Sequence, residues 1–123
     1  MRMTIWAAVA GMTAMAAVPA LAAPPQGETL FRQRCQMCHT DAPGARNGVG
    51  PNLSGLSGRT AGTAANYKYS PKLAKSGITW NSKTLDQFLT APNRMVPGTR
   101  MVISIPNKDE RKAVVGFLLK GKK

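Results

Sequence analysis

The chain has 123 residues and a formal net charge of +12, because 17 lysines and arginines stand against five aspartates and glutamates. This length is enough for one small domain and excludes two. With two cysteines and one histidine in total, the composition also excludes a structural zinc site, which requires four ligands.

Residues 1–22 have the features of a cleaved export signal. A positive charge near the start precedes an apolar run over residues 5–18, and Ala20 and Ala22 are small residues at the positions that a signal peptidase reads. The run is shorter than the ~20 apolar residues that a membrane-spanning helix needs, so a retained anchor is the less favoured alternative. We predict cleavage after Ala22, one domain over residues 23–123, and a periplasmic location.

The excess of basic residues indicates an acidic partner. Loss of Arg2 with the signal lowers the formal charge only from +12 to +11. Export argues against nucleic acid, and the basic residues are dispersed from Arg32 to Lys123 without a recognition-helix or aromatic-platform pattern. The dispersed charge therefore predicts either a solvated basic surface or steering toward acidic protein surfaces, with peripheral contact with an anionic membrane. We expect a monomer that binds no nucleic acid.

The first predicted helix begins at Gly27, with Glu28 near its positive end, and runs into residues 34–40. Residues 41–62 follow with six glycines and two prolines. A segment of that composition cannot form regular structure for long, which predicts a wrapped, irregular loop.

Two further helices are predicted from their capping residues. Ser70 before Pro71 is typical of an N-cap followed by proline at the first helical position, and this short helix should end near Gly77. Asn81 caps a second helix, which stops before Pro92.

The last helix is the clearest in the sequence. Asn107 and Glu110 have capping-box spacing, and a buried stripe follows before Gly121. No stretch shows the alternation of a strand bounded by turns. The coarse prediction is a small all-helical domain with long loops.

Both cysteines and the only histidine lie in the stretch RCQMCHT, residues 34–40. A thioredoxin-like redox pair would need a βαβ unit, which the sequence does not predict. A disulfide is compatible with export, but it would leave the histidine unexplained. On one helical turn Cys35, Cys38 and His39 project from the same face, so two thiols can bind one haem edge while the imidazole reaches the iron. The C-x-x-C-H pattern is the recognised haem attachment signal.

An iron held by His39 needs a ligand on its other side. Met37 lies inside the attachment motif, and Met95 follows a helix and has the character of a core residue. Met101 follows the turn at residues 97–100, which projects its side chain, so we predict Met101 as the second axial ligand.

Taken together, these motifs resemble the small, single-haem class I cytochromes c of the mitochondrial and alphaproteobacterial type. The resemblance covers nearly the whole mature chain and rests on residues 27–31, 35–39, 50–53, 77–80, 97–101 and the final helix. It implies an all-α class I cytochrome c fold, in which three main helices, a short helix and long loops wrap around one haem c. Cys35 and Cys38 would attach this haem covalently.

The resemblance also implies roles for loop residues. The Pro51 carbonyl would accept the free ring N–H of His39 and fix its orientation. Four side chains would receive the haem propionates, which need hydrogen bonds or opposite charge once removed from water: Arg59, Tyr67, Tyr69 and Trp80.

The same resemblance implies that the first and last helices cross closely, with Gly27 and Phe31 against Val114 and Phe117. Three positions depart from the pattern of the most familiar members. Phe88 replaces a tyrosine that bonds the axial sulfur, Leu73 an asparagine near the haem, and Ile103 a phenylalanine at the haem edge. We expect these replacements to change the reduction potential.

Histidine and methionine ligation leaves no open iron position, which indicates a one-electron carrier that is not an enzyme. The expected partners are a quinol-oxidising complex or periplasmic dehydrogenase as donor and a terminal oxidase or similar acceptor. Arg34, Arg94 and Arg100 match basic positions around the family's haem edge and would dock to acidic patches. A haem sensor or peroxidase-like enzyme, in which Met101 is displaced, is the alternative function, and an exported disulfide protein without haem is another.

Overall fold

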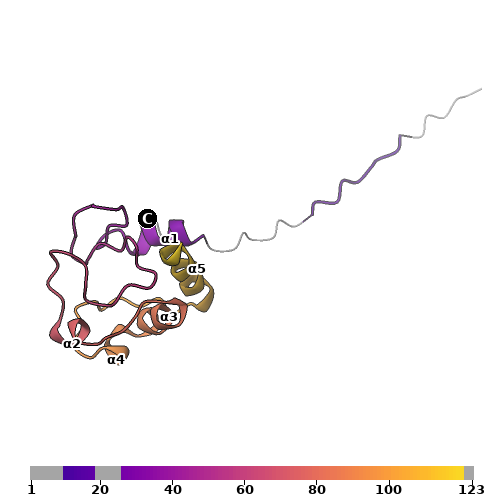
Figure 1. Cartoon of the computed structure of the whole chain (residues 1–123). Coiled ribbons are helices and arrows are strands. Elements are labelled where there is room, and N and C mark those ends of the chain that lie inside the picture. The colour runs from indigo at the N-terminus through magenta and orange to yellow at the C-terminus, as the bar shows by residue number, and fades with distance from the viewer. Residues whose placement is uncertain (1–9, 19–25, 121–123) are drawn as a thin grey trace, which may run out of the picture.

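The computed structural model describes residues 10–18 and 26–120, and Figure 1 shows helices joined by long loops. The described residues form five helices and no strand beyond a single bridge between Thr60 and Thr79. The helices are α1 (Gly27–Arg34), α2 (Pro71–Ala74), α3 (Ser82–Thr90), α4 (Pro92–Met95) and α5 (Lys108–Leu119). The predicted all-α architecture is confirmed, with one short helix more than expected.

The predicted export signal falls largely outside the described residues, as does its cleavage site at Ala22. The part that is described, residues 10–18, is exposed and forms neither helix nor strand. None of the described helices has the length and apolar character needed to cross a membrane.

Capping side chains start the helices where the sequence predicts. Asn81 Oδ1 accepts from the Lys83 and Thr84 amides, and the Thr84 hydroxyl accepts from the Asn81 amide, which completes a capping box. Ser70 caps α2 in the same way, with Pro71 at the first helical position.

The cap of α5 departs from the predicted capping box. Asn107 Oδ1 accepts from the Asp109 and Glu110 amides at 2.9 and 3.0 Å. The Glu110 carboxylate forms an ion pair with Arg34 of α1 at 2.8 Å. This residue therefore connects two helices that are distant in the sequence.

The short helix α4 was not predicted. Ala91, the residue before Pro92, has φ −158° and ψ 85°, as expected for a residue that a following proline pushes out of the helical region. This extended residue ends α3, and Pro92 then begins one new helical turn, since proline suits the first position of a helix.

Helices α1 and α5 cross at close quarters, side by side in Figure 1. A Cβ on Gly27 would lie 2.1 Å from the carbonyl oxygen of Ala113, so only glycine permits this approach. Phe31 and Phe117 stack with ring centroids 5.3 Å apart, and Val114 is fully buried. The predicted helix crossing is confirmed, with Gly27 and Phe31 against Phe117, and Val114 is buried in the same core.

Helix α3 packs against both α5 and α4 and buries Leu85, Phe88 and Leu89. These three side chains form one side of the interior, and the loops that follow α1 face them. The space between α3 and these loops is an internal cavity.

Candidate haem site

The internal cavity has a volume of about 490 Å³, within the ~300–1,000 Å³ typical of cofactor and ligand sites. It is lined by all nine residues that the sequence predicts for the site: Cys35, Cys38, His39, Pro51, Arg59, Tyr67, Tyr69, Trp80 and Met101. Their positions span most of the domain, so the fold brings the whole predicted set to one cavity.

The two cysteines lie at the end of α1, where the helix closes into a turn. The amides of Cys38 and His39 donate to the Cys35 carbonyl at 3.0 and 2.9 Å, which holds the three residues on one turn. The cysteines are free in the structure and not joined as a disulfide. Burial raises the pKa of the Cys35 thiol to about 11, against the opposing effect of Arg34.

The His39 imidazole has a defined tautomer. Its Nδ1 lies 2.8 Å from the Pro51 carbonyl oxygen, and since a carbonyl only accepts, Nδ1 carries the proton. Burial lowers the pKa of His39, while the bond to Pro51 opposes this effect. The ring is therefore neutral near pH 7, and its Nε2 lone pair is available to a metal.

Gly50 supports the same ring, a role that the sequence did not reveal. A Cβ on Gly50 would lie 2.4 Å from Cε1 of His39, so the backbone contacts the imidazole directly. The Gly50 amide also donates to the Cys38 carbonyl at 2.7 Å. The Gly-Pro pair thus positions the histidine from two directions.

Asn52 is a second positioning residue that the sequence did not single out. Its side chain donates to the carbonyls of Ala42 and Ala45 and accepts from the Ser54 amide, at 2.7–3.0 Å. Its own amide donates to Asn47 Oδ1 at 2.8 Å. Because Asn52 follows Pro51 directly, these bonds also fix the carbonyl that orients His39.

Arg59 lines the cavity and holds the same loop. Its guanidinium donates to the Ser54 carbonyl at 2.9 Å and to the Asn52 carbonyl at 3.1 Å. These two bonds leave other guanidinium N–H groups available. Its predicted role toward an anionic group stays a prediction.

The predicted aromatic group is assembled around the cavity. The Tyr67 hydroxyl donates to the Val49 carbonyl at 2.9 Å, and the Tyr69 hydroxyl accepts from the Ala64 amide at 3.1 Å. The two tyrosine rings meet edge to face, 4.8 Å between centroids. Burial is the main cause of the raised pKa of Tyr69, so this phenol stays protonated at neutral pH.

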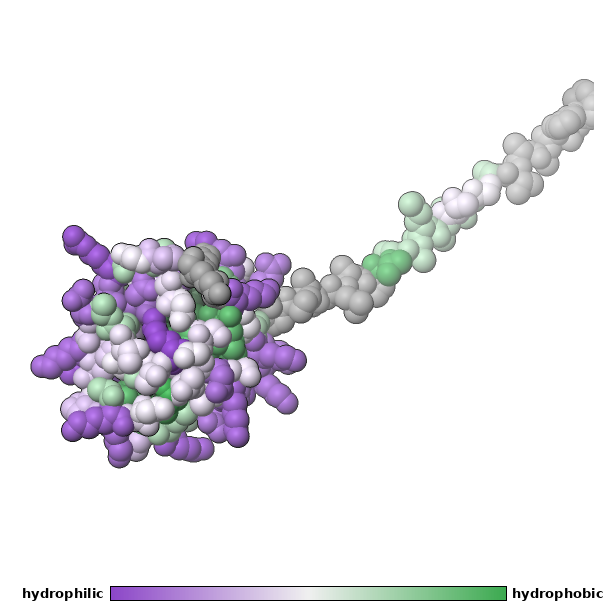
Figure 2. All heavy atoms as spheres, in the orientation of Figure 1, coloured by the Kyte–Doolittle hydropathy of each residue, from purple (hydrophilic) through white to green (hydrophobic). Residues whose placement is uncertain are grey.

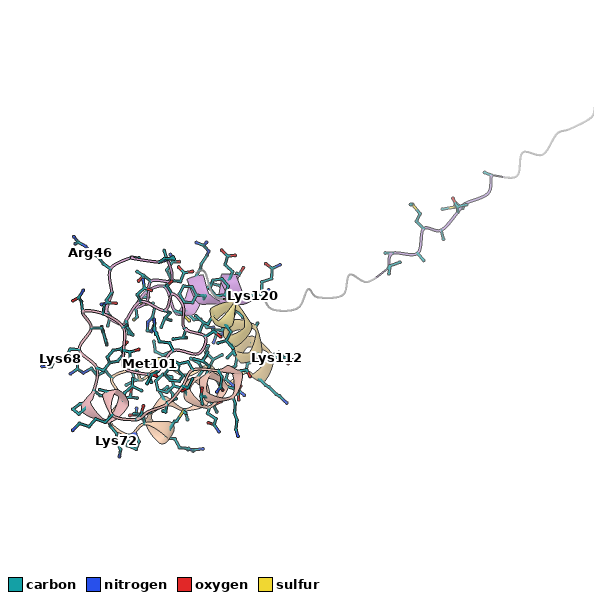
Figure 3. The ribbon with its side chains drawn as sticks, in the orientation of Figure 1. Arg46, Lys68, Lys72, Met101, Lys112 and Lys120 are labelled. Carbon is teal, nitrogen blue, oxygen red and sulfur yellow. The ribbon has the colours of Figure 1, made fainter. Side chains whose placement is uncertain are left out.

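The three candidate methionines differ in position. Met101 lines the cavity, and Figure 3 shows it in the interior among the packed side chains. Met95 packs against the hydrophobic core outside the cavity lining, and Met37 is 79% exposed. Only Met101 presents a thioether to the same cavity as His39.

Two buried polar residues of the cavity were not predicted as site residues. Ser70 and Thr99 are each 6% exposed and line the cavity. In the sequence Ser70 is recognisable as an N-cap before proline, and Thr99 as part of the turn before Met101. Neither local pattern reveals that the two side chains share a cavity.

The residues around this cavity fit a covalently attached haem. Two thiols and one imidazole lie on one turn, and a thioether lines the same cavity. The remaining walls are mainly apolar, with three arginines, a lysine and two tyrosines among them. A bare metal ion finds no comparable site, since the described residues contain no group of three or more His, Cys, Asp or Glu able to hold one.

Comparison with known proteins identifies relatives along most of the chain. The family model described as cytochrome c matches residues 25–122. Cytochrome c2 of Rhodoblastus acidophilus is 41% identical over 96 residues, which cover 77% of this chain and 89% of that protein. Cytochrome c2 iso-2 of Magnetospirillum molischianum is 43% identical over 95 residues, covering 76% and 93%. Cytochrome c of Cannabis sativa is 42% identical over 87 residues, covering 71% and 78%.

Proposed function

Since the chain belongs to the cytochrome c family and is a haem-containing electron carrier, we propose that it transfers single electrons through a haem ligated by His39 and Met101. The haem c of this family is covalent, and Cys35 and Cys38 have the spacing that attaches it. The observation that carries the proposal is the presence of one imidazole and one thioether around a single cavity.

Each named residue has a distinct task in this proposal. When bound, the haem supplies an iron that accepts and returns one electron. His39 presents Nε2 because Pro51 holds the proton on Nδ1. Leu56, Phe88 and other apolar side chains exclude water from the cavity. Occupied axial positions leave no site for a substrate, which favours electron transfer over catalysis.

The surroundings favour a comparatively high reduction potential. A neutral, soft thioether stabilises reduced iron relative to a second imidazole. Burial in an apolar cavity disfavours the additional charge of the oxidised state. Arg59 and the two tyrosines would hold the propionates in this proposal, since they line the cavity and carry hydrogen-bond donors.

The proposed partners are acidic surfaces of redox proteins. Residues 42–85 and 87–108 contain no aspartate or glutamate, and exposed Lys68, Arg94 and Arg100 lie within these segments. Figure 2 shows strongly hydrophilic side chains around the edge of the domain. Arg34, also predicted for docking, is paired with Glu110, so its charge is partly neutralised within the molecule.

We further propose a periplasmic location, with a quinol-oxidising complex or a dehydrogenase as donor and a terminal oxidase or similar acceptor. The apolar run and small residues of the predicted signal support export. Fractionation of producing cells will test the location, and the mass of the purified protein will show whether the signal has been cleaved. Retention of residues 1–22 would contradict cleavage.

Absorption spectra of the purified protein in both oxidation states test the ligation. We expect a low-spin spectrum with the weak red band of sulfur-ligated ferric haem. Met101→Ala should abolish this band and Met95→Ala should preserve it. A band lost in Met95→Ala and kept in Met101→Ala would reject the assignment.

Carbon monoxide separates electron transfer from a sensor or peroxidase-like function. The reduced native protein should bind little carbon monoxide at neutral pH, because Met101 occupies the iron, whereas Met101→Ala should bind it readily. Rapid binding by the native protein would favour the alternative function.

Docking can be measured by electron transfer to a gold electrode that carries a carboxylate-terminated monolayer. Lys68→Glu combined with Arg94→Glu should slow transfer at low ionic strength, and salt should remove the difference by screening. The control combines Lys112→Glu with Lys120→Glu, which change the net charge by the same amount. These two lysines lie apart from Lys68 in Figure 3. Equal slowing by both pairs would indicate net charge without a defined docking face.

A further inference from the structure

A buried arginine on α5 contacts the segment that carries Met101. Arg111 is 9% exposed, and its Nη1 donates to the carbonyls of Ile105 at 3.0 Å and Pro106 at 3.2 Å. Its Nε donates to Asp86 Oδ1 on α3 at 2.6 Å. The guanidinium therefore joins α3, α5 and the chain between Met101 and α5.

Helix α3 holds the same point of the chain directly. The Ile105 amide donates to the Leu89 carbonyl at 2.8 Å, and the Ile105 side chain is 2% exposed against the cavity. Ile105 and Pro106 are thus anchored by this bond and by the two bonds from Arg111.

The residues between this anchor and Met101 are held differently. No backbone hydrogen bond connects residues 101–104 to any other described residue, and Val102 is 77% exposed. At the other end, Arg100 Nη1 donates to the Lys68 carbonyl at 2.7 Å. Apart from the packing of its own side chain against the core, Met101 is therefore held through the two ends of its segment.

The charge on Arg111 would be costly without these partners. It is the only charged side chain among the described residues that is classed as buried. Burying a guanidinium is favourable only when its donors are bonded and its charge is paired. Its three hydrogen bonds end on Asp86, Ile105 and Pro106. The guanidinium therefore stabilises the chain at Ile105 and Pro106, where the segment that carries Met101 is anchored.

We propose that Arg111, oriented by Asp86, is a positioning residue that keeps Met101 in the cavity and sets how often its thioether leaves the iron. The inference rests on the proposed function, in which Met101 is an axial ligand. The two residues that restrain Met101 in this proposal lie on α3 and α5 and do not line the cavity.

Imidazole binding to the oxidised holoprotein tests this proposal. At saturating imidazole the observed rate equals the rate at which Met101 leaves. Arg111→Lys removes the planar group that bonds both carbonyls through Nη1 and Asp86 through Nε. We therefore expect the rate to rise about tenfold, as for loss of one charge-assisted hydrogen bond. Asp86→Asn keeps an oxygen at the same position and should raise the rate less, about threefold.

Val115→Ala is the matched control, because Val115 is a buried residue of α5 that lies outside the cavity lining. It should lower the free energy of unfolding while leaving the imidazole rate within about twofold of the native value. An unchanged rate in Arg111→Lys, or an equal rise in Val115→Ala, would overturn the proposal.

Hydrogen exchange of the Ile105 amide tests the anchoring role of Arg111 independently of whether Met101 is the iron ligand. Faster exchange in Arg111→Lys than in Val115→Ala supports the anchor whatever the iron ligand is, and equal exchange rejects it. A native protein without the red absorption band would instead refute the ligation on which the imidazole experiment depends.

Discussion

The two sides of the cavity are built differently. On the His39 side, Gly50, Pro51, Asn52 and Arg59 form a network of hydrogen bonds within one loop, next to the imidazole itself. On the Met101 side, the segment is bonded only near its ends, at Arg100 and at Ile105–Pro106.

This difference indicates two kinds of restraint. The imidazole is fixed by its immediate neighbours, so displacing it requires the loop to break several bonds at once. The thioether is fixed from a distance, so a single anchor can change its position without disturbing the rest of the fold. We expect variants on the His39 side to affect stability and potential, and variants on the Met101 side to affect ligand release.

The largest effect should come from Gly50→Ala, which tests the contact between backbone and imidazole. The new Cβ would meet the His39 ring at 2.4 Å, and the ring cannot retreat without losing the Pro51 bond. We expect the free energy of unfolding to fall by about 3 kcal/mol in urea titrations.

Gly98 provides the matched glycine on the Met101 side. It has φ +81° and open space around the Cβ position, so Gly98→Ala should cost only the backbone strain, about 1 kcal/mol. If the two variants lose equal stability, the proposed difference between the two sides is wrong.

The next effect is expected for Asn52→Ala, which removes three side-chain hydrogen bonds from the loop. Unfolding should become easier by about 2 kcal/mol, and voltammetry should show a shifted reduction potential because the Pro51 carbonyl is no longer held. Asn52→Asp keeps the acceptor for the Ser54 amide and should shift the potential less. A destabilised variant with the native potential would limit Asn52 to a structural role.

A smaller effect on stability is expected for Arg100→Ala. Its bond to the Lys68 carbonyl is exposed, so the cost in unfolding free energy should be about 1 kcal/mol. Imidazole should bind several-fold faster, because one end of the Met101 segment is released. Arg46→Ala removes an exposed arginine on the His39 side and should leave the rate unchanged.

The smallest effect on stability is expected for Glu110→Gln, since exposed ion pairs contribute at most about 1 kcal/mol. This variant frees Arg34, which is 40% exposed, from its partner. Adsorption of the holoprotein on a carboxylate-terminated monolayer should strengthen at low ionic strength. Unchanged adsorption would show that Arg34 takes no part in docking.

Local signals in the sequence predicted most of the fold. Asn81, Ser70 and Asn107 begin their helices as expected, because capping depends on residues only two or three positions away. Helix α4 is not predicted by the sequence, because a proline indicates the end of the preceding helix, whereas Pro92 here also begins a new turn.

Motif spacing and the turn before residue 101 predicted the two cysteines, His39 and Met101, and the family resemblance added the other five site residues. Neither revealed the residues that support them. Gly50 and Asn52 act through contacts with the His39 ring and with carbonyls five to ten residues away, in a loop without periodicity. Arg111 was not singled out in the sequence either, because its burial and its bond to Asp86, 25 positions earlier, depend on the packing of α5 against α3.

The sequence by itself determined the attachment motif and the starts of α1, α2, α3 and α5, since these follow from residue type and short-range spacing, and it indicated Met101 through the turn before it. Only the tertiary structure decided that Gly50 and Asn52 support the loop beside the imidazole and that Arg111 is buried. Such choices depend on contacts between distant segments, where packing and desolvation act on all partners together.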